Sequence, residues 1–102
     1  MRVLIVDDEP YLAHLMQVVL AEEGYVVQVA HSLREAKTAE GPFDLVVADV
    51  RLPNGDGRHL RECYPDTPFL TMSGYPDELP DLPKPFTPAV FRAAVRQAVL
   101  HR

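Results

Sequence analysis

The sequence contains little of what several classes of protein require. Its 102 residues include one cysteine, Cys63, so an internal disulfide is excluded and a reducing, cytoplasmic setting is expected. The apolar runs are only a few residues long, which argues against a membrane-spanning helix, and the first residues do not resemble a signal peptide. The formal net charge is -5 and Lys and Arg form no run, so we expect no direct binding of nucleic acid.

The composition that remains is that of a globular protein. The apolar fraction is 47% and the charged fraction is 25%, which is too apolar for a disordered chain. The length suits one domain, and no repeat or linker divides it. We therefore expect residues 1–102 to form a single domain.

Short apolar runs predict the strands. Residues 3–6, 45–48 and 69–72 are continuous apolar runs without alternation, as in parallel strands that are covered on both faces. Residues 26–30 are more broken, as in an edge strand. Helical patterns lie between these runs: one begins at Pro10 and ends near Gly24, a short one begins at Ser32, and the last begins at Thr87. The alternation predicts an open, doubly wound parallel α/β sheet.

Polar side chains follow three of the predicted strands. Asp7 and Asp8 follow the first, Asp49 the third, and Ser73 the fourth. Ligands bind at the carboxyl ends of the strands in such sheets, and converging carboxylates repel one another unless a cation neutralises them. Oxygen ligands suit Mg²⁺. The alternative is that these aspartates only cap helices or mark turns.

Lys84 is predicted to reach the same edge of the sheet from a strand near residues 81–83. Carboxylates, a metal, the Ser73 hydroxyl and an ammonium group together suit a phosphoryl group that is carried on a carboxylate. Asp49 would then be the nucleophile.

The motifs VDDEP (6–10), DVRLPNGDG (49–57), MSG (72–74) and KPF (84–86) occur in this order, and the chain resembles the receiver domain of two-component response regulators over nearly its whole length. The resemblance implies a flavodoxin-like sheet of strand order 2-1-3-4-5. It also implies a signalling module and not an enzyme in the ordinary sense.

The resemblance implies a role for each motif residue. Asp49 matches the phosphoacceptor. Asp7 and Asp8 match the acidic pair that holds Mg²⁺ together with Asp49 and the backbone carbonyl of Arg51. The switch and phosphoryl-binding positions match Ser73, Gly74 and Lys84, and Pro85 matches a proline that follows a cis peptide bond.

Two features depart from the family. Only about five residues separate Ser73 from a fifth strand that begins near Leu79, which is too few for a parallel crossover that contains a helix. We therefore predict that the fourth helix is missing, and that the third helix has only about two turns. The family's switch aromatic is replaced by Asp81, and Tyr75 is a candidate substitute or a loop residue that packs over the bare sheet.

Several functions stay open at this point. The main hypothesis is a receiver that takes a phosphoryl group from a histidine kinase or a phosphotransfer protein, either alone or as part of a longer protein. The alternatives are a receiver-like binding module that works without phosphorylation and, more weakly, a metal-dependent phosphatase. Since the missing helix would uncover apolar residues, we also expect a homodimer or another partner on that face. The four histidines (His14, His31, His59 and His101) are expected to be solvated.

Overall fold

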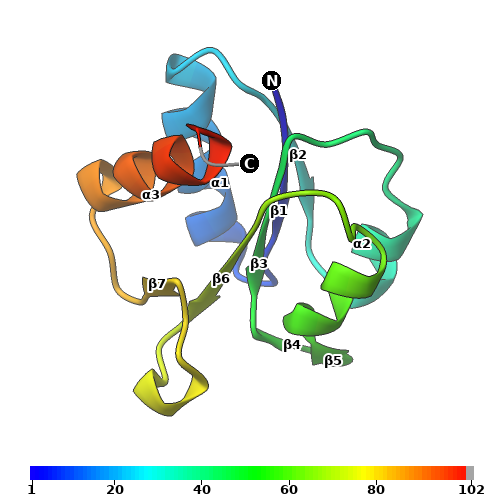
Figure 1. The fold of residues 1–102 in the computed structure, drawn as a ribbon. Helices are drawn as coiled ribbons and strands as arrows, with labels where there is room; N and C mark the ends of the chain where they lie inside the picture. Colours follow the sequence, from blue (N-terminus) through cyan, green and yellow to red (C-terminus); the bar gives the residue numbers. More distant parts are fainter. Residues whose placement is uncertain (101–102) are drawn as a thin grey trace.

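The computed structural model describes residues 1–100, and its centre is a parallel sheet. The strands are β1 (Arg2–Val6), β2 (Val26–Ala30), β3 (Leu45–Asp49), β6 (Phe69–Ser73) and β7 (Leu82–Pro83). Their spatial order is β2-β1-β3-β6-β7 (Figure 1), which confirms the predicted order 2-1-3-4-5. A separate antiparallel ribbon of β4 (Arg51–Leu52) and β5 (Gly55–Asp56) follows β3.

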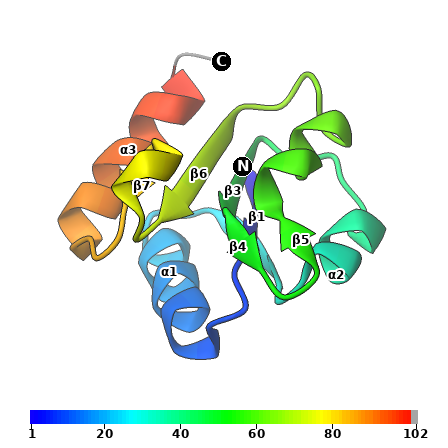
Figure 2. The same ribbon diagram turned by 90° about the horizontal axis from the view of Figure 1, so that it is seen from below.

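Helices cover both faces of the sheet. The helices α1 (Pro10–Glu22) and α3 (Pro88–Leu100) lie on one face (Figure 2), and α2 (Leu33–Thr38) and the 3-10 helix η1 (Gly57–Glu62) lie on the other. Each face has its own apolar cluster. Alternation along β1 divides its side chains between them: Val3 and Ile5 pack toward α1 and α3, whereas Leu4 and Val6 pack toward α2 and η1.

The exposure of the strands explains their sequence patterns. All five residues of β3 are buried, because β3 lies in the middle of the sheet and both its faces are covered. In β2, exposed and half-buried positions alternate and only Ala30 is buried, which agrees with the predicted edge position of this strand.

The predicted helix starts are largely confirmed. Pro10 begins α1, the Ser32 hydroxyl accepts from the Glu35 amide at 3.1 Å, and the Thr87 hydroxyl accepts from the Val90 amide at 3.2 Å. The bonds around Ser32 differ from a standard capping box, in which the Glu35 carboxylate would accept from the Ser32 amide. The Glu35 carboxylate accepts from the His31 amide, one residue before the cap.

The connections around β6 are shortened as predicted. The third helix is the six-residue η1, and between β6 and β7 lies only η2 (Pro76–Glu78), a single 3-10 turn. The pairing of β7 with β6 begins at Leu82 and not near Leu79, so the connection is longer than expected but still holds no α-helix. The missing fourth helix is confirmed.

The face left open by the missing helix is less apolar than expected. Alternation places Phe69, Thr71 and Ser73 on this face of β6, while Leu70 and Met72 pack on the opposite side. Thr71 is tied to Asp81: its amide and hydroxyl donate to the Asp81 carboxylate at 2.9 and 3.1 Å, and its hydroxyl accepts from the Asp81 amide at 3.0 Å. The expected apolar patch is therefore reduced, because polar pairs replace part of the apolar surface that a helix would bury.

Within residues 1–100, no helix is both long enough and apolar enough to cross a bilayer.

Candidate phosphoacceptor site

Three carboxylates meet at the carboxyl ends of β1 and β3. Asp7 and Asp8 follow β1, Asp49 ends β3, and one oxygen from each lies within 4.8 Å of the others. Asp7 is fully buried and Asp49 nearly so, while Asp8 is exposed. The structure thus brings together the three aspartates that the sequence singled out.

Lys84 lies between two of these carboxylates. Its Nζ is 3.0 Å from Asp7 Oδ2 and 3.0 Å from Asp49 Oδ2. Its backbone amide donates to the Ser73 carbonyl at 2.8 Å, so the pairing with β6 continues to this residue. The peptide bond between Lys84 and Pro85 is cis, as is the bond between Gly41 and Pro42.

Backbone amides orient the remaining carboxylate oxygens. The Glu9 amide donates to Asp7 Oδ1 at 2.9 Å, and the Arg51 amide donates to Asp49 Oδ1 at 3.2 Å. Gly57 lies against the backbone of Asp49, where an added Cβ would be 1.9 Å from the Asp49 carbonyl oxygen. A larger residue at position 57 would therefore displace the chain around Asp49.

The charges in this cluster shift the pKa of two groups. Burial raises the pKa of the Asp49 carboxyl and Asp7 adds to this, although the hydrogen bond from Lys84 opposes it. Burial alone would lower the pKa of the Lys84 ammonium, but the hydrogen bonds to Asp49 and Asp7 more than compensate and raise it. Lys84 therefore stays charged, and one cation faces three carboxylates.

The donor set fits a hard divalent cation. Its ligand atoms are carboxylate oxygens, which Mg²⁺ prefers, and one ammonium group leaves part of the negative charge without compensation. Asp8 is exposed at the rim, which suits an ion that keeps part of its water shell. The acidic group is typical of the Mg²⁺ site of receivers.

Ser73 and its neighbours form a second group at the end of β6. The Ser73 hydroxyl donates to Glu78 Oε1 and accepts from the Tyr75 amide at 3.0 Å. A Cβ added at Gly74 would meet no atom within 4 Å. Tyr75 is half exposed, and the centre of its ring lies 3.6 Å from the Arg51 guanidinium carbon, so the ring stacks on Arg51.

Sequence reasoning missed two residues near the site. Glu78 contacts Ser73 and pairs with Arg51, whose Nε is 3.3 Å from Glu78 Oε2. A carboxylate in a connection too short for a helix was the only available signal. His31 is exposed, as expected, and its Nδ1 also lies 3.1 Å from the Asp7 carbonyl oxygen. His14 and His59 are exposed, and His101 lies outside the described residues.

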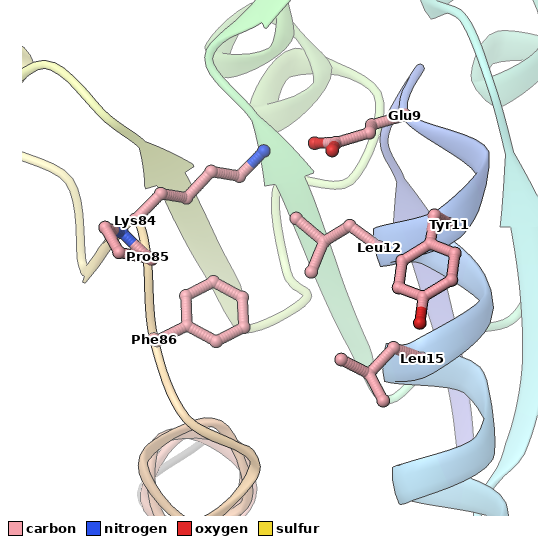
Figure 3. A pocket seen from close by; sticks show the side chains of 7 residues that line it. All are labelled: Glu9, Tyr11, Leu12, Leu15, Lys84, Pro85 and Phe86. Atoms are coloured by element: carbon pink, nitrogen blue, oxygen red, sulfur yellow. The ribbon is translucent and has the colours of Figure 1, made fainter.

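An apolar pocket of about 440 Å³ adjoins the acidic cluster. Tyr11, Leu12 and Leu15 line it from α1, and Pro85 and Phe86 line it from the segment after β7 (Figure 3). Glu9 and the Lys84 ammonium lie at the end nearest the carboxylates. The site therefore has one apolar wall and one charged wall.

Comparison with known proteins agrees with this geometry. The family described as "Response regulator receiver domain" matches residues 3–84, and the chain belongs to this family. It is thus a receiver domain of two-component signalling, a signalling module and not a classical enzyme.

Among curated relatives, the transcriptional regulatory protein TrcR of Mycobacterium tuberculosis is 46% identical over 79 residues, which cover 69% of this chain and 30% of TrcR. The chain spans 18%, 30% and 37% of the length of the first three relatives that it matches.

Two solved structures are informative for the site. The beryllofluoride-activated NtrC4 receiver domain dimer has a TM-score of 0.84 and 32% identity, covering 98% of this chain and 97% of that one. The response regulator TrrA of Thermotoga maritima, in complex with Mg²⁺ and beryllofluoride, has a TM-score of 0.82 and 27% identity, covering 95% and 97%. Both are similar over almost the whole chain.

Proposed function

We propose that this receiver accepts a phosphoryl group on Asp49 from the phosphohistidine of a histidine kinase or a phosphotransfer protein. The observation that carries the proposal is the bridge of Lys84 between Asp7 and Asp49 at 3.0 Å, with Asp8 beside it. In this proposal Asp49 is the acceptor, Asp7 and Asp8 are the cation-binding pair, and Lys84 is the partner of the phosphoryl group. We place the reaction in the cytoplasm, because the single cysteine suits a reducing compartment.

The transfer is a displacement at phosphorus. An Asp49 carboxylate oxygen attacks the phosphorus, the bond from phosphorus to the imidazole nitrogen breaks, and the electron pair stays on that nitrogen. Lys84 is positioned to pair with the phosphoryl oxygens once Asp49 is modified. Asp7, Asp8, Asp49 and the Arg51 carbonyl would hold Mg²⁺, which supplies positive charge to those oxygens.

A phosphoryl mimic tests the proposal directly. We expect beryllofluoride with Mg²⁺ to shift NMR resonances around Asp49, and acetyl phosphate with Mg²⁺ to add one phosphoryl group by mass spectrometry. Asp49→Asn should abolish both effects, because an amide is a poor nucleophile for this step.

Asp56→Asn is the matched control, since Asp56 lies outside the acidic group and bonds to Arg58. It should react like the wild type. An adduct that persists in Asp49→Asn would assign the acceptor to another residue and contradict the proposal.

A second copy of the chain is a further proposed partner, on the face left by the missing helix. The support is the NtrC4 receiver dimer in its activated form. The apolar surface expected as the driving force is reduced by the pairing of Thr71 with Asp81, so we propose that a homodimer needs the phosphoryl mimic to form.

One observation favours a second function, a binding module that works without phosphorylation. Glu78 already accepts the hydrogen bond of the Ser73 hydroxyl, which in a phosphorylated receiver would go to a phosphoryl oxygen. The beryllofluoride experiment separates the two, since a chain that forms no adduct at Asp49 supports the binding module.

A further inference from the structure

The inference rests on the proposed phosphoacceptor function and concerns Glu78, a carboxylate in the shortened connection between β6 and β7. Its two oxygens are both engaged. Oε1 accepts from the Ser73 hydroxyl, and Oε2 is 3.3 Å from Arg51 Nε. The side chain of Glu78 is only 15% exposed, so these contacts are partly shielded from water.

The hydroxyl of Ser73 has no spare hydrogen for another acceptor. A serine hydroxyl donates one hydrogen bond, and Ser73 donates it to Glu78, while the Tyr75 amide occupies the acceptor side at 3.0 Å. To bond a phosphoryl oxygen on Asp49, Ser73 must therefore leave Glu78. Breaking a hydrogen bond to a charged, partly buried group opposes that movement.

Arg51 holds Glu78 in this position. Its guanidinium pairs with the carboxylate and at the same time stacks on the Tyr75 ring at 3.6 Å. Since Arg51 begins β4, two residues after Asp49, its side chain joins the segment that follows the acceptor to the connection that carries Glu78.

The backbone of the connection is strained at the residue after Glu78. Leu79 has a φ of 50°, a left-handed conformation that a leucine rarely adopts. Its side chain is 85% exposed, so its burial does not compensate for the strain. The turn that Leu79 ends is the turn that places Glu78 against Ser73.

We propose that Glu78 competes with the phosphoryl group for the Ser73 hydroxyl. In the unphosphorylated chain Glu78 accepts the hydrogen bond from Ser73, with Arg51 as its counter-ion. This hydrogen bond must break before Ser73 can bond to the phosphoryl group. Glu78 is a positioning residue in this role, because it acts through Ser73 and does not touch the reacting atoms. The shortened connection thus supplies a restraint on switching that a serine alone would not have.

The test is an NMR titration of the isotope-labelled chain with beryllofluoride at fixed Mg²⁺. We expect Glu78→Ala to bind the mimic about tenfold more tightly than the wild type, because the competent state no longer has to break the contact between Glu78 and Ser73. Glu78→Gln should lie between the two, since it keeps an acceptor for Ser73 but loses the ion pair with Arg51.

Two controls isolate the contact. Asp77→Ala removes an equal charge from the same turn, at an exposed residue, and should bind like the wild type. In a Ser73→Ala background, Glu78→Ala should give no gain, because no hydroxyl remains to be released.

The outcomes distinguish this inference from the proposed function. No adduct in the wild type or in any variant overturns both. An adduct in the wild type with unchanged affinity in Glu78→Ala overturns the inference alone, as does an equal gain in Asp77→Ala or in the Ser73→Ala background. An adduct that forms only in Glu78→Ala supports the inference but contradicts the proposed function, since the wild type would then act as a binding module.

Discussion

At the scale of single residues, Lys84 determines whether the acidic cluster is tolerated without a metal. It is the cation that bridges Asp7 and Asp49, and its side chain is only 18% exposed. The hydrogen bonds to these carboxylates raise the pKa of Lys84 although burial opposes this, so the ammonium group stays charged at neutral pH. Without this charge, three carboxylates would repel one another.

Lys84→Met is expected to lower the free energy of unfolding in EDTA by about 3 kcal/mol or more, because removing one partner leaves buried carboxylates without compensation. Mg²⁺ should stabilise this variant more than the wild type, since it then supplies the only positive charge in the cluster. Thermal unfolding with EDTA and with Mg²⁺ measures both effects.

Lys37→Met is the control, because Lys37 is exposed on α2. It should change stability little. An unchanged midpoint for Lys84→Met in EDTA would show that the cluster does not depend on this ammonium group.

At the scale of elements, β7 is a strand of two residues that side-chain bonds help to hold. Asp81 precedes it and exchanges hydrogen bonds with Thr71 on β6, and its carboxylate is 4.0 Å from Arg61 on η1. This explains the departure at position 81. Asp81 stands at the position of the family's aromatic residue, and its hydrogen bonds to Thr71 attach the edge strand β7 to β6.

Asp81→Ala should weaken the attachment of β7 to β6 and cost about 1–3 kcal/mol, since the Thr71 amide and hydroxyl lose their acceptor in a buried place. Hydrogen exchange should show faster exchange at Leu82 and Lys84 than in β1 or β3.

Asp66→Ala, an exposed acidic residue in the connection between η1 and β6, is the control. If β7 keeps its protection in Asp81→Ala, backbone pairing alone holds the strand.

Much of the fold and of the site could be predicted from local patterns. Unbroken apolar runs that end at Asp7 and Asp49 gave both the parallel strands and the meeting of the carboxylates, because carboxyl ends of parallel strands share one edge. Glu78 could not be predicted, since its partners depend on the turn at Leu79. The polar character of the open face was also missed, because the bonds between Asp81 and Thr71 depend on the exact register of β7.

At the scale of the whole molecule, the described part measures 31 × 29 × 25 Å and lacks one covering helix. On the open side, the Arg61 guanidinium lies 4.8 Å from the centre of the Phe69 ring, and Asp81 bonds to Thr71. These contacts cover the sheet in part with polar groups. The face therefore offers a weaker hydrophobic reason to associate than a bare sheet would.

We expect the chain to sediment as a monomer at micromolar concentration without beryllofluoride, because polar groups cover part of the open face. With beryllofluoride and Mg²⁺ we expect a shift toward a dimer, in line with the proposed activated homodimer. Sedimentation velocity under the two conditions measures this. A dimer without the mimic would contradict the argument from polarity, and a monomer with it would contradict the proposed homodimer.

The prolines in and after β7 have a consequence for aggregation. The Lys84 amide points toward β6, so alternation directs the preceding position, Pro83, toward the outer edge, and Pro85 follows one residue after Lys84. Neither proline has an N–H group, and the Asp81 amide is already bonded to Thr71. This edge therefore presents no row of free donors to an incoming strand. Pairing of a second chain with β7 is therefore disfavoured, which reduces the tendency of this short open edge toward fibril-like growth.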